Sequence, residues 1–296
     1  MTRSSLLTFV VVAAACGRPA PSARRDAAPE VVAAGATDAA PAPDATPTTI
    51  ELAGLYDGDA CVLVRYPDTT LRQNDPARCA EPVRPASTFK IVNALIGADA
   101  GLLAGPDAVM TYDRKRYPRQ AHWPADWAQD QPLRTAMEIS AVPLFQRLAT
   151  QIGEDRMHMA LDVLGYGNRK LTAPLDRFWL EGPFAVTAAQ QIALITGLVT
   201  NRLPMTPAAQ AIVREVIPRE TAPDGAVLHF KTGTAPLDDG PWIAWLVGWI
   251  DRDGQQIEYA CWIKHPAADV DVIRARRIEV CRGALDRLGL FPAPPA

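Results

Sequence analysis

β-rich runs lie at both ends of the folding part of this chain, and helical patterns lie between them. Short runs rich in β-branched and aromatic residues, bounded by turn residues, are typical of strands. The expected strands are Ala60–Tyr66, a segment near Thr70–Gln73 after a turn at Pro67-Asp68, Val227–Thr234, Trp242–Ile250 and Glu258–Lys264. This order predicts an α+β fold, in which an antiparallel β-sheet is flanked by helices and joined by an all-helical subdomain.

Helical periodicity and capping residues mark the segments between these strands. A loop that contains Trp123 and Trp127 is expected from Tyr112 to Pro132, and Thr187 and Gln190 form a capping box. The expected helices begin at Ser87, with the apolar run Ile91–Leu103, and continue with Val142–Gly153, Glu154–Gly165, Ile192–Val199, a helix with Pro207 at its first position, and about Asp271–Leu288.

The N-terminus has the pattern of an export signal. Arg3 precedes the apolar run Leu6–Ala15, which is too short to span a bilayer, and Cys16 follows. We expect residues 1–16 to be a signal peptide of the lipoprotein type, with lipid on Cys16 as the only membrane contact; an ordinary Ala-x-Ala cleavage site is the alternative. Residues 17–49 are expected to be a disordered Ala/Pro-rich tether, and residues 50–292 the folded domain. The protein is then exported, as a periplasmic or membrane-tethered protein.

Charge and cysteine content exclude two classes of partner. The net charge is −3 and no basic stripe is interleaved with aromatic residues, so no nucleic acid is expected. The chain has no C-x-x-C motif and its histidines do not cluster in sequence, so no metal is expected. Four cysteines of the folded domain allow three pairings. We prefer Cys61–Cys79, which flank the first hairpin, and then Cys261–Cys281; unpaired buried thiols are the alternative for the second pair.

The segment Pro85-Ala86-Ser87-Thr88-Phe89-Lys90 places a hydroxyl and an amine three residues apart. In a helix these positions share one face, and Ser87 would lie at the N-terminus, where backbone N–H groups favour developing negative charge. Lys90 can act as a base towards Ser87 only if its amine is neutral. The sequence therefore predicts that Lys90 is buried or chemically modified.

Three further segments complete an ordered set of motifs. They are Ser140-Ala141-Val142 before a helix, Tyr166-Gly167-Asn168 after one, and Lys231-Thr232-Gly233-Thr234 at the end of a strand. Each match alone is weak, but their order and local context are specific. We expect Tyr166 and Asn168 to shape a turn near Ser140, and Gly233 to let a ligand approach the backbone.

The set resembles the class D (oxacillinase-type) serine β-lactamases of the penicillin-recognising serine enzymes. Phe178-Trp179-Leu180-Glu181-Gly182 and Trp242–Trp249 are similar to the same family. Val142 distinguishes class D, with S-x-V, from class A with S-D-N and from transpeptidases with S-x-N. The resemblance implies hydrolysis of the β-lactam amide bond of penicillin- and cephalosporin-type antibiotics through an acyl-serine, with residues 50–292 as the catalytic domain.

The resemblance also implies that Lys90 is N-carboxylated by CO₂ and acts as the general base, with no other cofactor. Trp179 would donate its indole N–H to the carbamate, although simple core packing is its alternative role. Val142 would keep the Lys90 amine dry, together with Phe89 and Leu180.

The remaining roles follow from the same resemblance. The backbone N–H groups of Ser87 and Thr234 would form the oxyanion hole, and Ser140, assisted by Lys231, would pass a proton to the lactam nitrogen. Lys231 and Thr232 would hold the substrate carboxylate with an arginine of the last helix. Apolar spacing favours Arg277 for this arginine, and Arg274 is its competitor.

Two other functions carry similar motifs. A β-lactam sensor domain is acylated but does not turn over, and a penicillin-binding transpeptidase acts on cell-wall peptides. A sensor would be expected to follow several membrane spans, whereas this chain has one short export segment. The S-x-V motif disfavours the transpeptidase. The range of β-lactams and the oligomeric state stay open.

Overall fold

A computed structural model describes residues 48–171, 174–266 and 269–293 of the 296-residue chain. The predicted signal peptide, Cys16 and all but the last two residues of the predicted tether lie outside the described residues. Those last two residues, Thr48 and Thr49, were expected to be disordered but form strand β1, because their backbone pairs in parallel with β3. No helix in the described part of the chain combines the length and apolar character needed to cross a bilayer.

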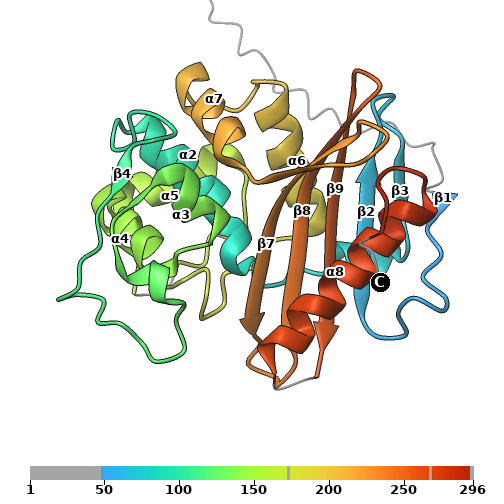
Figure 1. Ribbon diagram of the computed structural model, residues 1–296, viewed down its shortest axis with the longest axis horizontal. Helices are drawn as coiled ribbons and strands as arrows, with labels where there is room; N and C mark the ends of the chain where they lie inside the picture. The colour runs from blue at the N-terminus through green and yellow to red at the C-terminus, as the bar shows by residue number, and fades with distance from the viewer. Residues whose placement is uncertain (1–47, 172–173, 267–268, 294–296) are drawn as a thin grey trace, which may run out of the picture. The chain divides into compact units, whose positions relative to one another are not determined.

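Seven strands form one sheet in the order β1-β3-β2-β9-β8-β7-β6, and every pairing except β1 with β3 is antiparallel (Figure 1). The N-terminal strands therefore join the C-terminal ones in one sheet, as the sequence predicted, and the structure shows that β2 and β9 make the junction. The strands are β1 Thr48–Thr49, β2 Ala60–Arg65, β3 Leu71–Gln73, β6 Arg219–Thr221, β7 Val227–Pro236, β8 Trp242–Arg252 and β9 Gln255–His265. A separate two-stranded sheet pairs β4 Val109–Met110 with β5 Gln131–Pro132.

Helices cover both faces of the large sheet. Helix α8 (Val270–Arg287) packs on the face that includes Leu246 and Cys261, whereas α6 (Ala188–Val199) packs on the face that includes Trp245 and Trp262. Neighbouring residues of a strand point to opposite faces, so the long apolar strands β8 and β9 serve two cores at once. The α+β prediction is confirmed.

A helical lobe lies beside the β7 side of the sheet (Figure 1). Helix α2 is its centre and packs against α4 and α7, and one continuous hydrophobic core joins this lobe to the sheet. The remaining elements, most of which belong to this lobe, are α1 Pro76–Ala80, η1 Ala86–Phe89, α2 Lys90–Asp99, η2 Ala125–Ala128, α3 Leu133–Glu138, α4 Val142–Ile152, α5 Glu154–Leu164 and α7 Pro207–Val216.

The helix expected to start at Ser87 begins instead at Lys90. Ser87 lies in the preceding 3₁₀ turn η1, in which Thr88 donates both its backbone N–H and its hydroxyl to the Pro85 carbonyl at 3.2 and 2.8 Å. The positive φ of Ala86, 50°, turns the chain just before Ser87. The capping box of Thr187 and Gln190 is present, as predicted.

Both expected disulfides are present. Cys61 of β2 is bonded to Cys79 of α1, and Cys261 of β9 is bonded to Cys281 of α8. The second bond ties α8 directly to the sheet, so the alternative of two unpaired thiols was wrong for this pair.

Candidate active site

Turn η1 and strand β7 meet at the point where the helical lobe joins the sheet. A Cβ atom on Gly233 would lie 2.7 Å from the Pro85 carbonyl oxygen and 3.2 Å from the Ser87 nitrogen. The close neighbour of Gly233 is thus the backbone around Ser87. We predicted that Gly233 lets a ligand approach the backbone of β7. In the structure, the absence of a side chain at Gly233 lets the backbone of η1 approach it.

Ser87 and Lys90 form the centre of the candidate site. The Lys90 Nζ lies 2.7 Å from the Ser87 Oγ. Ser87 is half-buried, whereas Lys90 is fully buried. Burial, and in second place repulsion from Lys231, hold the pKa of Lys90 well below its ordinary value. A neutral amine can accept the proton of the neighbouring hydroxyl.

Aromatic rings keep water away from Lys90. The Phe145 ring centre lies 5.5 Å from Lys90 Nζ, and Phe89 stacks on Trp179 at 5.2 Å between ring centres. Phe178 packs edge-on against both Phe89 and Trp179. The buried Trp179 Nε1 has no hydrogen-bond partner among the described residues. An N–H group left in this state is costly, so it indicates that a polar group belongs beside it.

A second hydroxyl–amine pair joins Ser140, which lies just before α4, to Lys231 of β7. The Lys231 Nζ donates to the Ser140 Oγ at 3.1 Å and to the Thr232 carbonyl at 3.2 Å. Ser140 has a positive φ of 58°, which turns the chain between α3 and α4. Burial, followed by repulsion from Arg277, lowers the pKa of Lys231 to about 7. Both Lys90 and Lys231 are therefore amines with weakened proton affinity.

Arg277 and Arg274 of α8 differ in their surroundings. The buried Arg277 donates from Nη1 to the Thr234 Oγ1 at 2.9 Å, and burial, followed by repulsion from Arg274, lowers its pKa to about 10. Arg274 is largely exposed and pairs with Asp271 at 3.0 Å. Arg277 therefore contacts the end of β7 from within the protein, whereas Arg274 lines the cleft that Thr234 also lines.

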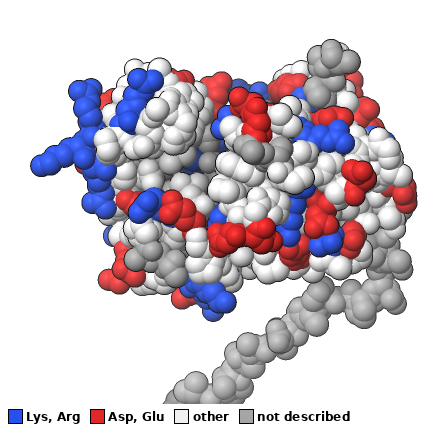
Figure 2. All heavy atoms as spheres, turned by 90° about the horizontal axis from the view of Figure 1, so that it is seen from below, with Lys and Arg blue, Asp and Glu red and all other residues white. Residues whose placement is uncertain are grey.

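A cleft of about 1030 Å³ adjoins the site; Val142, Thr234 and Arg274 line it, whereas Ser87, Lys90, Ser140, Lys231 and Arg277 are not among its lining residues. Figure 2 views the molecule from below the orientation of Figure 1 and shows the surface hollowed between the helical lobe and the rest of the protein. Val142 and Thr234 lie on the cleft wall, together with Trp127 from the loop before α3 and Leu180 from the turn that carries Trp179. The volume suits a small molecule.

Two buried polar groups that support the site were not predicted. Arg84, three residues before Ser87, donates to the carbonyls of Gly182, at 2.9 Å, and of Pro236. Carbonyl groups leave no signature in a sequence, so no local pattern could have indicated these contacts.

The second group lies beneath η1. Tyr166 donates to Gln191 at 3.1 Å, and Gln191 donates to the Thr88 hydroxyl at 2.8 Å. Tyr166 was expected to support the surroundings of Ser140, but this chain of hydrogen bonds supports the turn of Ser87 instead. The side chain of Asn168 donates to the Pro183 carbonyl at 2.7 Å.

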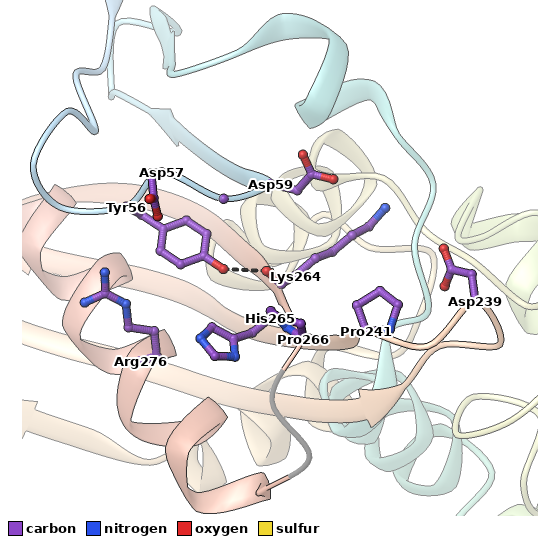
Figure 3. A pocket seen from close by; sticks show the side chains of 10 residues that line it. Tyr56, Asp57, Asp59, Asp239, Pro241, Lys264, His265, Pro266 and Arg276 are labelled. Atoms are coloured by element: carbon purple, nitrogen blue, oxygen red, sulfur yellow. Dashed lines mark hydrogen bonds between the residues drawn. The ribbon is translucent and has the colours of Figure 1, made fainter.

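A second hollow, of about 560 Å³, lies where β8 begins and β9 ends, at the same end of the sheet as the end of β7 (Figure 3). Its charged side chains include Asp59, Lys264 and Arg276, which form ion pairs with Arg78, Glu81 and Glu279 respectively. None of the predicted site residues lines it. Within the described residues, no group of histidine, cysteine and carboxylate side chains could hold a metal ion.

Comparisons with known proteins agree on one family. Residues 56–277 match the family described as the penicillin binding protein transpeptidase domain. β-Lactamase OXA-10 of Pseudomonas aeruginosa is 36% identical over 201 residues, which cover 67% of this chain and 73% of that protein. The crystal structure of the class D β-lactamase YbXI from Nostoc superposes with a TM-score of 0.70 at 34% identity, covering 78% of this chain and 94% of that one. The regulatory protein BlaR1 of Bacillus licheniformis is 29% identical over 71% of this chain but only 33% of its own length.

Proposed function

The chain belongs to the class D serine β-lactamases, within the penicillin-binding transpeptidase family, and on that premise we propose how its residues open a β-lactam ring. The protein is a hydrolase of the β-lactam amide bond. The observation that carries the mechanism is the 2.7 Å contact between the Ser87 Oγ and the fully buried amine of Lys90.

Ser87 is the proposed nucleophile. Its Oγ attacks the lactam carbonyl carbon, and its proton leaves towards the base at Lys90. The low pKa of Lys90 keeps the amine nitrogen unprotonated, which its reaction with CO₂ requires. The backbone N–H groups of Ser87 and Thr234 stabilise the negative charge that develops on the carbonyl oxygen, where one such donor is worth about 3–4 kcal/mol. The close packing of Gly233 on η1 supports this pairing, because it holds β7 against the turn of Ser87.

Ser140 and Lys231 are the proposed route for the proton that the lactam nitrogen needs when the C–N bond breaks. Their 3.1 Å contact allows the Ser140 hydroxyl to donate to that nitrogen while the Lys231 ammonium replaces the proton. A Lys231 pKa of about 7 makes this second transfer easy near neutral pH. Water then hydrolyses the acyl-serine and frees Ser87.

The substrate carboxylate is the proposed ligand of the cations at the end of β7. Arg277 and Lys231 carry the positive charge, and the hydroxyls of Thr232 and Thr234 add neutral donors. Val142 forms an apolar part of the same wall.

The surroundings of Lys90 fit a carbamate made from its neutral amine and CO₂. The fit rests on the dry, low-pKa amine and on the partnerless Trp179 Nε1, which would donate to that group. When bound, CO₂ would supply a negatively charged oxygen beside Ser87 that can act as a general base. General-base catalysis of this kind accelerates a step by roughly 10²–10⁴-fold.

Turnover of a chromogenic cephalosporin tests the proposed function. We expect many equivalents of product per protein molecule, and no product from Ser87→Ala. The similarity to BlaR1 keeps one competing function in view, namely a β-lactam sensor. A single stoichiometric burst followed by a stable acyl-protein would contradict hydrolysis and support the sensor.

The proposed location of the enzyme is outside the cytoplasmic membrane, to which a lipid on Cys16 would tether it after export. Export and lipidation are supported by the apolar run Leu6–Ala15 and the cysteine that follows it. Expression of the full chain with labelled palmitate should label the protein and should not label Cys16→Ser. Equal labelling of both proteins, or none of either in the exported fraction, would contradict lipidation.

A further inference from the structure

A buried hydrogen bond joins two loops on the wall of the cleft. The Tyr117 hydroxyl donates to the Asp176 Oδ2 at 2.9 Å, across 59 residues of sequence. Tyr117 is 7% exposed and Asp176 is 8% exposed. Both residues line the same cleft as Val142 and Thr234. The mechanism proposed above uses neither of them.

The chemistry of this contact makes it durable. Burial, and then the hydrogen bond to Asp176, raise the pKa of Tyr117 to about 12, so the phenol stays a donor. Arg116 donates from Nε to the Tyr117 hydroxyl at 3.0 Å and lies 3.6 Å from the Asp176 carboxylate. A hydrogen bond to a charged, buried acceptor is stronger than one between neutral groups.

Asp176 belongs to the compact turn that carries Trp179. The Arg177 N–H donates to the Pro174 carbonyl at 3.0 Å, and the Arg177 carbonyl accepts from the N–H of Leu180 at 2.8 Å and of Glu181 at 2.9 Å, so backbone hydrogen bonds span the turn from Pro174 to Glu181. The Trp179 ring stacks on Phe89, the residue before Lys90. Asp176 and the indole of Trp179 therefore belong to one hydrogen-bonded turn, which packs against the residue before Lys90.

We propose that Tyr117 and Asp176 are positioning residues, which hold the Trp179 turn so that its indole N–H stays aimed at the carboxylated Lys90. This inference rests on the proposed function, and it deepens that function by assigning the retention of CO₂ to a contact between two loops. Neither side chain touches the reacting atoms in this account.

The test compares Tyr117→Phe with the parent across a series of ¹³C-bicarbonate concentrations. Two quantities are measured, namely the carbamate signal in the ¹³C NMR spectrum and the rate of cephalosporin turnover. We expect the bicarbonate concentration for half occupancy to rise about tenfold, which corresponds to about 1.4 kcal/mol. At saturating bicarbonate, we expect turnover to return to within about twofold of the parental rate.

Three further variants sharpen the comparison. Tyr66→Phe is the matched control, because the buried Tyr66 hydroxyl has no partner among the described residues, and its half-occupancy concentration should equal the parental one. Asp176→Ala should reproduce Tyr117→Phe, and the double variant should be no worse than either single one. Asp176→Asn keeps an acceptor for the Tyr117 hydroxyl, so its bicarbonate concentration for half occupancy should rise less than that of Asp176→Ala.

An unchanged half-occupancy concentration in Tyr117→Phe would overturn the inference. So would a loss of turnover that bicarbonate does not restore while the carbamate signal stays parental, because that result would make the contact merely structural. Failure of the proposed function looks different, since the parent protein itself would then show neither turnover nor a carbamate.

Discussion

The amines of Lys90 and Lys231 are both shielded from water. Their burial lowers the stability of the folded protein and also lowers the pKa values on which the proposed chemistry depends. Lys90 is fully buried and Lys231 is 2% exposed. A buried ammonium that lacks a carboxylate partner is unfavourable, so both amines lose proton affinity. At the scale of single residues, the activity of this site and its cost in folding free energy have the same origin.

Lys231→Met tests this cost. The folded pKa of Lys231 is about 7, against an ordinary value of 10.5. Between these pH values the unfolded chain holds a proton that the folded chain has lost, so the parental free energy of unfolding rises with pH across this window. We expect Lys231→Met to be more stable than the parent at pH 7, on the order of 3 kcal/mol, and this gain to shrink as the pH approaches 10.5.

Urea unfolding of the variant and the parent at several pH values measures the effect. Lys115→Met is the control, because Lys115 is exposed, and its free energy of unfolding should follow the parental one at every pH. A Lys231→Met gain that is absent at pH 7, or that does not change with pH, would contradict a depressed pKa for this amine.

Strand β7 and turn η1 form the contact that matters most at the scale of elements. Gly233 allows their backbones to meet, since a Cβ atom there would lie 2.7 Å from the Pro85 carbonyl oxygen and 3.1 Å from the Thr88 nitrogen. Both of these neighbouring atoms belong to the backbone and cannot swing aside as a side chain would. A methyl group at this position must therefore push the strand away from Ser87.

Gly233→Ala should therefore lower kcat/KM by about tenfold or more, because a small displacement of the Thr234 N–H weakens the proposed oxyanion hole. Steady-state kinetics on folded protein measure this effect. Gly105→Ala is the matched control, since no atom lies within 4 Å of the added Cβ, and it should keep the parental value. Parental kinetics in Gly233→Ala would show that β7 need not touch η1.

Elements with a strong local signal could be predicted from the sequence. The long strands and α4, α5, α6 and α8 follow from periodicity, and the capping box fixes the start of α6. Strand β6 has three residues, all exposed, and so gives no apolar pattern, whereas α3 buries Leu133, Ala136 and Met137 but is only six residues long, too short for its period to stand out from the loop before it. Ser87 was misplaced at a helix start because a 3₁₀ turn and an α-helix share the i, i+3 spacing.

The candidate site was predictable where its residues belong to short motifs. The motif serines and lysines could be named because each pair stands in a recognisable local context. Tyr117 and Asp176 could not be paired, because nothing in either loop states that the two loops meet. The same holds for Arg84, whose partners in the fold include backbone carbonyls.

The whole molecule places its site where the helical lobe meets the sheet, and α8 completes the site from the other face. Arg277 reaches Thr234 from α8, and the Cys261–Cys281 bond ties that helix to β9 four residues further along. The Cys61–Cys79 bond joins β2 to α1, away from Arg277.

Replacing each cysteine pair by alanine separates stability from function. Each double variant should lose about 3 kcal/mol of unfolding free energy, the typical cost for loops of this length. Only the Cys261 and Cys281 pair should also raise KM, because only that bond fixes the helix of Arg277. Equal KM values in the two double variants would contradict this role of α8.

The central claim is that Lys90 is a dry, neutral amine that takes up CO₂ beside Ser87. The most direct measurement is the ¹³C NMR spectrum of the full-length protein in labelled bicarbonate, recorded for the parent and for Lys90→Ala. We predict a carbamate signal in the parent and none in Lys90→Ala, together with a fall in turnover of at least about 10²-fold in the variant. A parent that is fully active and gives no carbamate signal would contradict the claim.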